Sequence, residues 1–119
     1  MKKLFAAVLA LLVVTSGAPA FAHAELTGAS PKANVLLKKA PQEIRLTFDD
    51  DLIPILESNQ IAVTNSKNVR VDKNDSTVLG NQLRTSLKKL QPGKYQVTYR
   101  VLSADGHPIA SKYSFTIKK

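Results

Sequence analysis

The stretch Lys94-Tyr95-Gln96-Val97-Thr98-Tyr99-Arg100-Val101 decides the fold, because polar and apolar residues alternate along all of it. Alternation with a period of two is the pattern of a β-strand that is buried on one face. The buried face of this strand would carry Tyr95, Val97, Tyr99 and Val101. Gln91-Pro92-Gly93 comes directly before the stretch and is typical of a tight turn. The sequence therefore predicts a long, half-buried strand that begins after this turn.

Other runs of the same kind lie on both sides of this strand. Ile109–Ile117 carries Tyr113, Phe115 and Ile117 in one register, and Glu43–Phe48 directs Ile44, Leu46 and Phe48 inward. Because the aromatic residues fall on inward faces, we expect them to fill the core and not to form a ligand platform. Shorter candidate strands are Ala24–Ala29, Gln60–Thr64, Val69–Val71, Thr77–Leu79 and Gln82–Leu87.

Short strands separated by turns, with no convincing amphipathic helix, indicate an all-β protein. About seven strands in a chain of this size predict an antiparallel, immunoglobulin-like β-sandwich, and a barrel is the alternative architecture. We interpret Asn34–Lys39 as a linker. Leu52–Leu56 is apolar but contains Pro54, so we expect a loop or an edge there and not a central strand.

The first 22 residues have the features of a secretory signal peptide. Lys2 and Lys3 precede an apolar run from Leu4 to Val14, and small residues follow up to Ala20-Phe21-Ala22. The apolar run is shorter than the roughly 20 residues that a membrane-spanning helix needs. We therefore expect cleavage after Ala22 and export of one domain, residues 23–119, to the periplasm or its equivalent.

Composition limits the chemistry of the exported domain. The chain has no cysteine and its one methionine is Met1, so any metal site must use nitrogen and oxygen ligands. The formal charge of +8 falls to +6 without Lys2 and Lys3. The lysine pairs at 38–39, 88–89 and 118–119 are dispersed along the sequence, and an exported domain is not expected to meet nucleic acid. We interpret them as a solvated surface, with weak attraction to anionic lipid as the lesser alternative.

Ser103-Ala104-Asp105-Gly106-His107-Pro108 is the candidate functional stretch. In extended backbone, Asp105 and His107 would project to the same side about 6 to 7 Å apart, so that one ion could contact both. Gly106 tolerates backbone angles that are closed to other residues, and Pro108 favours extended backbone at His107. The alternative interpretation is a polar turn, because Asp-Gly is also a common hairpin signal. Asp49-Asp50-Asp51 would mark the exposed end of a strand.

Several motifs, in this order and spacing, resemble the CopC family of exported copper-binding proteins over nearly all of residues 23–119. They are His23-Ala24-Glu25-Leu26, Ser30-Pro31, Pro41, Leu90-Gln91-Pro92-Gly93-Lys94-Tyr95, and Ser103–Pro108 before Tyr113-Ser114-Phe115. The resemblance implies a Greek-key sandwich that binds Cu(II). It implies the α-amine and imidazole of His23, a carboxylate oxygen of Asp105 and the imidazole of His107 as ligands, with Asp50 as a possible further one. Members that bind Cu(I) use a methionine-rich segment, which this chain lacks.

The function that this resemblance implies is a non-catalytic Cu(II) carrier or buffer in copper resistance or copper supply. The resemblance alone implies a partner, a multi-span inner-membrane copper transporter of the CopD kind. A copper-dependent monooxygenase also uses an amino-terminal histidine, but it needs an open copper position that Asp105 would fill here. A sandwich without any metal is the third interpretation.

Overall fold

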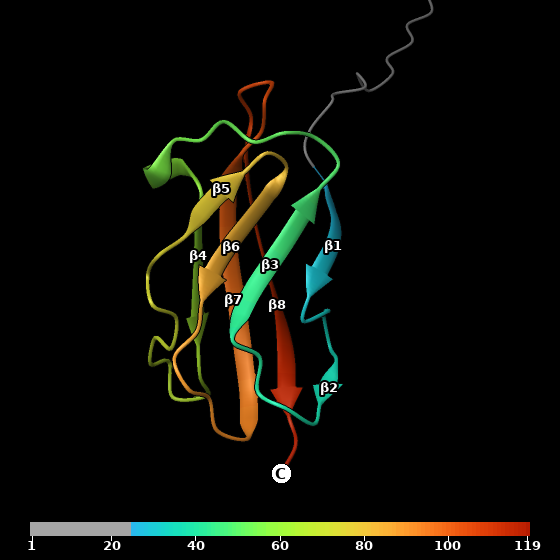
Figure 1. The fold of residues 1–119 in the computed structure, drawn as a ribbon, viewed down its shortest axis with the longest axis vertical. Helices are drawn as coiled ribbons and strands as arrows, with labels where there is room; N and C mark the ends of the chain where they lie inside the picture. The colour runs from blue at the N-terminus through green and yellow to red at the C-terminus, as the bar shows by residue number, and fades with distance from the viewer. Residues whose placement is uncertain (1–24) are drawn as a thin grey trace, which may run out of the picture.

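The computed structural model describes residues 25–119, so the predicted signal peptide and His23 lie outside the described residues. Figure 1 shows the arrangement of the strands. The described elements are β1 (Leu26–Ser30), β2 (Leu36–Leu37), β3 (Glu43–Phe48), the short 3-10 helix η1 (Leu56–Ser58), β4 (Gln60–Thr64), β5 (Thr77–Leu79), β6 (Gln82–Ser86), β7 (Gly93–Leu102) and β8 (Pro108–Ile117).

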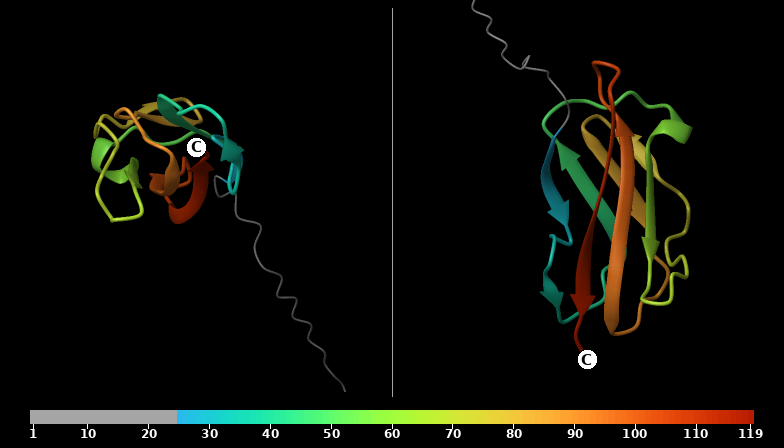
Figure 2. Two further views of the ribbon diagram at one scale, coloured as in Figure 1. Left: turned by 90° about the horizontal axis from the view of Figure 1, so that it is seen from below. Right: turned by 180° about the vertical axis from the view of Figure 1, so that it is seen from behind.

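The strands form two sheets of four that pack face to face (Figures 1 and 2). One sheet has the order β1-β3-β6-β5 and the other β2-β8-β7-β4, and the chain changes sheet at most of its connections. All neighbours are antiparallel except β2 and β8. The predicted immunoglobulin-like Greek-key sandwich is confirmed. The alternative barrel is not formed.

The core confirms the predicted inward faces. Along β7, Tyr95, Val97, Tyr99 and Val101 are all buried. The Tyr95 ring stacks on Phe115 of β8 with ring centroids 5.5 Å apart, and the edge of Tyr99 meets Phe48 of β3 at 5.8 Å. Because these rings link the two sheets or pair neighbouring strands inside the sandwich, they belong to the core and not to a ligand platform.

Two predicted segments differ from the structure. Leu36–Leu37, predicted as linker, forms the short strand β2 because it pairs in parallel with the end of β8. Val69–Val71, predicted as a strand, forms no regular strand. Arg70 makes an isolated bridge with Thr64, and the next residue after the segment, Asp72, makes one with Leu87. The segment is shared between two edges of the sandwich, so it belongs to neither sheet as a regular strand.

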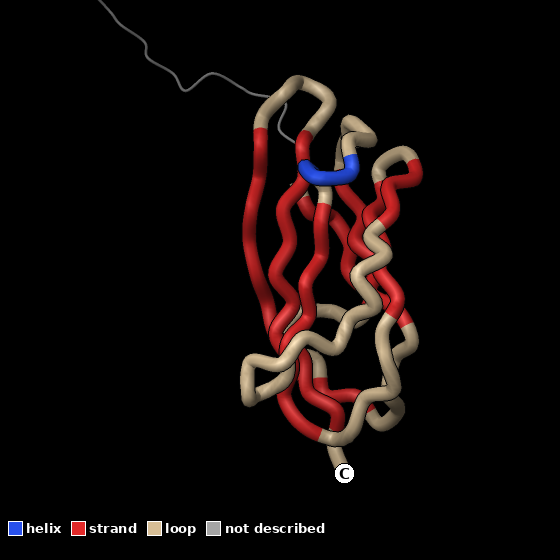
Figure 3. Tube along the Cα trace, turned by 90° about the vertical axis from the view of Figure 1, so that its left-hand side faces the viewer, coloured by secondary structure: helices blue, strands red, loops and turns tan. Residues whose placement is uncertain are grey.

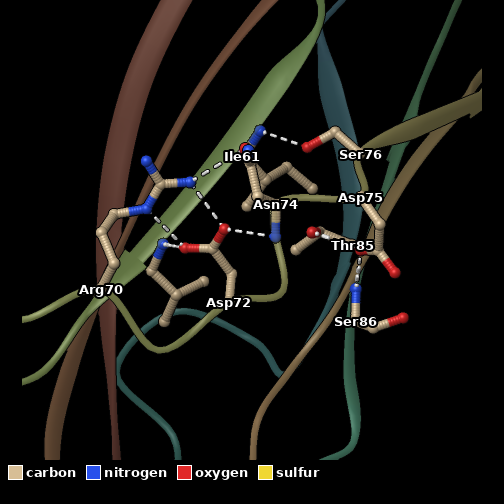
Figure 4. A network of polar contacts seen from close by, with 9 residues as sticks. Ile61, Arg70, Asp72, Asn74, Asp75, Ser76, Thr85 and Ser86 are labelled. Carbon is tan, nitrogen blue, oxygen red and sulfur yellow. Dashed lines mark hydrogen bonds and ion pairs between the residues drawn. The ribbon is translucent and has the colours of Figure 1, made fainter.

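The segment from residue 65 to residue 76 closes the side of the sandwich where β4 has no neighbouring strand (Figure 3). Side chains replace the missing strand: Asp72 accepts the N–H of Val63 at 2.8 Å, and Ser76 accepts the N–H of Ile61 at 2.9 Å. Figure 4 shows these groups together with the Arg70–Asp72 ion pair. This closure protects the edge strand from pairing with other chains. Among residues 25–119, no helix has the length and apolarity to cross a membrane.

Candidate metal site

The candidate stretch is the loop that joins β7 and β8 at one end of the sandwich, at the top of Figure 1. It lies against the segment that follows β3. The N–H of Ala104 donates to the carbonyl of Asp51 at 3.0 Å, and the N–H of Ile53 donates to the carbonyl of Leu102 at 2.9 Å. Because both hairpin arms are part of the ten-residue strands β7 and β8, the loop is held by the longest strand pair in the fold.

Asp105 and His107 are brought together by a turn, which corrects the expectation of extended backbone between them. Residues 104–106 form a turn and bend, and Gly106 has a φ of 87°, a left-handed value that favours glycine. The turn places Asp105 Oδ2 3.1 Å from His107 Nδ1. The stretch therefore forms the polar turn of the alternative interpretation, and this turn brings the two side chains together. Ion binding by the pair stays a prediction.

Ser103 organises the loop, and sequence reasoning assigned it no role. Its side chain is buried, and its Oγ–H donates to Asp105 Oδ1, while the backbone N–H of His107 donates to the same oxygen at 3.2 Å. The backbone of Ser103 also donates to the carbonyl of His107 at 3.0 Å and accepts from the N–H of Gly106 at 2.8 Å. The sequence signal for this role is a serine two residues before an aspartate in a turn, because serine hydroxyls often form hydrogen bonds with groups nearby in the chain.

The Asp105–His107 pair has the chemistry of half a metal site. The hydrogen bond from Ser103 and those from His107 outweigh desolvation and lower the pKa of the Asp105 carboxyl, so it is a carboxylate at neutral pH. Two ligands at about 2.0 Å from a tetragonal ion would be about 2.8 Å apart, close to the observed separation. Within residues 25–119, no three His, Asp or Glu side chains gather closely enough to hold a metal ion.

The start of the described chain lies at this same end. Glu25 and Leu26 line one side of a surface groove of about 690 Å³, and His107 and Pro108 line it with them. Glu25 is fixed by Asp49, whose Oδ1 accepts the Glu25 N–H at 2.6 Å and whose N–H donates to the Glu25 carbonyl at 2.9 Å. Two residues span at most about 7 Å, so the chain itself keeps His23 within about that distance of Glu25. Its ligation stays a prediction.

The acidic run follows the end of β3, as expected, and one of its residues has a further role. Asp50 Oδ1 accepts the N–H of Asp51 at 2.8 Å, and Asp50 does not line the groove shared by Glu25 and His107. Its role as a further ligand stays a prediction. Asp49, expected only to mark the end of the strand, also accepts a hydrogen bond from the backbone N–H of Glu25. Tyr99 lines the groove but its ring packs on Phe48, in accord with a packing role.

Comparisons with known proteins cover the same range. A family model described as CopC domain matches residues 26–118. Protein YobA of Escherichia coli K12 is 33% identical over 116 residues, 92% of this chain and 91% of the relative. Copper transport protein CutJ of Bacillus subtilis 168 is 32% identical over 117 residues, 94% of this chain but 21% of CutJ. The crystal structure of CopC from Methylosinus trichosporium OB3b has a TM-score of 0.73 at 29% identity, covering 81% of this chain and 94% of that one. The similarity thus spans nearly the whole sandwich.

Proposed function

Because the chain belongs to the CopC family, we propose that it is an exported, non-catalytic Cu(II) carrier or buffer of the periplasm. One observation carries the proposal. A carboxylate and an imidazole lie 3.1 Å apart in a braced hairpin loop, beside the groove that Glu25 and Leu26 line. The proposed ligands are His23, through its α-amine and imidazole, Asp105 and His107. Asp50 is a candidate for a further oxygen ligand.

The donor set supports Cu(II) as the cargo. An amine, two imidazoles and a carboxylate form a nitrogen-rich tetragonal set, and Cu(II) has the highest affinity of the common divalent ions for such ligands. Soft Cu(I) favours thiolate and thioether sulfur, and the chain has no cysteine and no methionine after Met1. Zn(II) lies below Cu(II) in the affinity order for nitrogen and oxygen ligands, so it would bind the same groups more weakly.

A membrane copper transporter of the CopD kind is the proposed partner. The chain aligns with about a fifth of CutJ, whose name describes copper transport. In that relative, a region similar to this chain is part of a longer protein. Such an arrangement supports a role in which this domain exchanges copper with a transporter, in copper resistance or in copper supply.

The amino terminus gives the sharpest test of the site. The α-amine of His23 can bind copper only after the Ala22–His23 bond is cut, so a chain that begins at Ala22 should bind Cu(II) much more weakly than one that begins at His23. Cleavage after Ala20 would instead place His23 third, where it can bind copper through backbone amides without Asp105 or His107. Mass spectrometry of the exported protein identifies which terminus exists.

Copper titration of the chain beginning at His23 completes the test. We expect His23→Ala and His107→Ala each to weaken binding and to change the paramagnetic spectrum of tetragonal nitrogen ligation. Amines and imidazoles bind metal only when deprotonated, with usual pKa values of about 7.7 to 8.0 and 6.5, so affinity should fall between pH 7 and pH 5. Equal affinity at both pH values, or no effect of His107→Ala, would show that these ligands are misassigned.

A further inference from the structure

The segments that carry the dispersed lysine pairs lie at the end of the sandwich opposite the hairpin loop (Figures 1 and 2). Strand pairing places them there: Gly93, at the start of β7, pairs with Ile117, at the end of β8. Lys118 donates its N–H to the carbonyl of Leu37, which pairs with Ile117 from the other side. Lys88 donates its N–H to Val71 just beyond the end of β6. We name this surface the lysine end, with the exposed residues Lys38, Lys39, Lys67, Lys88, Lys89, Lys94, Lys118 and Lys119.

A groove of about 380 Å³ forms part of the lysine end. Lys67, Lys89 and Lys94 line it, together with neutral groups such as Asn65 and Gln91, and the lining contains no carboxylate among the described residues. Two acidic side chains near this end are held in ion pairs: Asp72, which pairs with Leu87, binds Arg70 at 2.6 Å, and Glu43 at the start of β3 binds Arg45 at 2.9 Å. The groove therefore offers three ammonium groups and amide donors without a competing anion.

The opposite end of the sandwich has the reverse charge. Six acidic residues lie in or beside the hairpin loop, the β3–β4 connection and the start of β1: Glu25, Asp49, Asp50, Asp51, Glu57 and Asp105. Arg100 lies near Glu57 and donates to its carbonyl at 2.8 Å. The ten residues of β7 separate the two ends by about 30 Å. Because the Debye length is about 8 Å at physiological salt, a charged surface that touches one end does not act on the other.

We propose that the lysine end docks on an anionic phospholipid surface, with the hairpin loop pointing away from the bilayer. Lysine clusters of this size are attracted to anionic headgroups, and three lysines line the groove in which a phosphate would sit. An exported domain meets lipid headgroups and not nucleic acid, so lipid is the polyanion that fits. The consequence is an orientation: the domain would stand end-on and present the candidate metal site to proteins that project from the membrane.

Vesicle binding tests this proposal with a matched control. The chain beginning at His23 is mixed with phosphatidylcholine vesicles that contain or lack phosphatidylglycerol, and bound protein is measured by sedimentation at low and at physiological salt. We expect binding only with phosphatidylglycerol, weakening as salt rises. Lys67→Gln, Lys89→Gln and Lys94→Gln combined should weaken it by about tenfold or more. The control combines Lys32→Gln, Arg84→Gln and Lys112→Gln, which removes the same charge midway along the sandwich and should bind nearly as the parent does.

Orientation gives an independent readout. The chain has no cysteine, so Ser66→Cys and Ala104→Cys each allow one polarity-sensitive dye, at the lysine end and at the hairpin loop respectively. We expect phosphatidylglycerol vesicles to change the emission of the dye at residue 66 and not that of the dye at residue 104. Equal binding to both vesicle types, equal losses in the two triple variants, or binding to a short DNA duplex but not to vesicles would overturn the proposal. Copper is absent from all of these measurements, so their failure leaves the proposed function untouched.

Discussion

Replacing Asp72 by alanine should destabilise the domain more than any other single carboxylate removal on the side of the sandwich. The Asp72 side chain is fully buried, and its two oxygens accept four hydrogen bonds. Val63 N–H and Arg70 Nε–H donate to Oδ1, both at 2.8 Å. Arg70 Nη2 donates to Oδ2 at 2.6 Å and Asn74 N–H donates to it at 3.0 Å. The carboxylate thus connects the free edge of β4 to the segment that covers it.

The loss in unfolding free energy depends on whether water can reach the former hydrogen-bond partners of Asp72 in the alanine variant. The N–H of Val63, in a fully buried residue, would lose its acceptor, at a cost of about 1 to 3 kcal/mol. The Arg70 side chain is 50% exposed and Asn74 is exposed, so both regain water and the lost ion pair costs only about 0.5 to 1 kcal/mol. We expect a loss of about 2 to 4 kcal/mol, or a fall in Tm of at least about 8 °C for a domain of this size.

Urea unfolding of the metal-free domain at pH 7, followed by circular dichroism, measures this loss. Asp72→Asn keeps an acceptor for Val63 and loses the charge, so it should cost only about 1 kcal/mol. Glu57→Ala removes an exposed carboxylate and should change stability by less than about 0.5 kcal/mol. A loss below about 0.5 kcal/mol for Asp72→Ala would refute the argument that this carboxylate closes the edge of β4.

The same carboxylate predicts a pH dependence. Burial opposes the charge of Asp72, but the hydrogen bonds from Arg70, Val63 and Asn74 prevail and lower its pKa. A lowered pKa in the folded state means that the stabilisation is fully present above the unfolded pKa of about 3.9 and is lost as pH falls through the folded value. The stability difference between the parent and Asp72→Asn should therefore shrink below about pH 4 and stay constant between pH 5 and pH 7.

Two further predictions concern the candidate site. Ser103→Ala removes the hydroxyl that donates to Asp105, so Cu(II) affinity should fall about 10- to 100-fold, as is common for groups that orient metal ligands. Ser103→Thr keeps the hydroxyl and should retain most of the affinity. Unchanged titration curves for Ser103→Ala would contradict the bracing role. Asp49→Ala removes the acceptor of the Glu25 N–H and should weaken copper binding, because Glu25 lies two residues after the proposed ligand His23. Asp49→Asn keeps an acceptor and should largely restore binding. The control Asp51→Ala, at an exposed neighbour, should bind copper as the parent does.

Much of the fold could be predicted from alternation alone. β3, β4, β7 and β8 lie where the period-two pattern placed them, because a strand with one buried face must repeat every two residues. β2 could not be predicted, since two residues carry no period and their pairing with β8 depends on a partner about 80 positions away in the chain. The segment around Arg70 has the composition of a strand, but it lies between two edges and joins neither sheet.

The sequence by itself determined the sandwich, the family resemblance, and the residue types available for a metal, because these depend on local pattern and composition. Tertiary structure decided what those residues can do together. The turn at Gly106 brings Asp105 within 3.1 Å of His107, Asp49 fixes the amino-terminal segment beside them, and the strand directions collect the lysines at the far end. Contacts between residues distant in the chain depend on how strands pair and which way they run, and no local window of sequence contains that information.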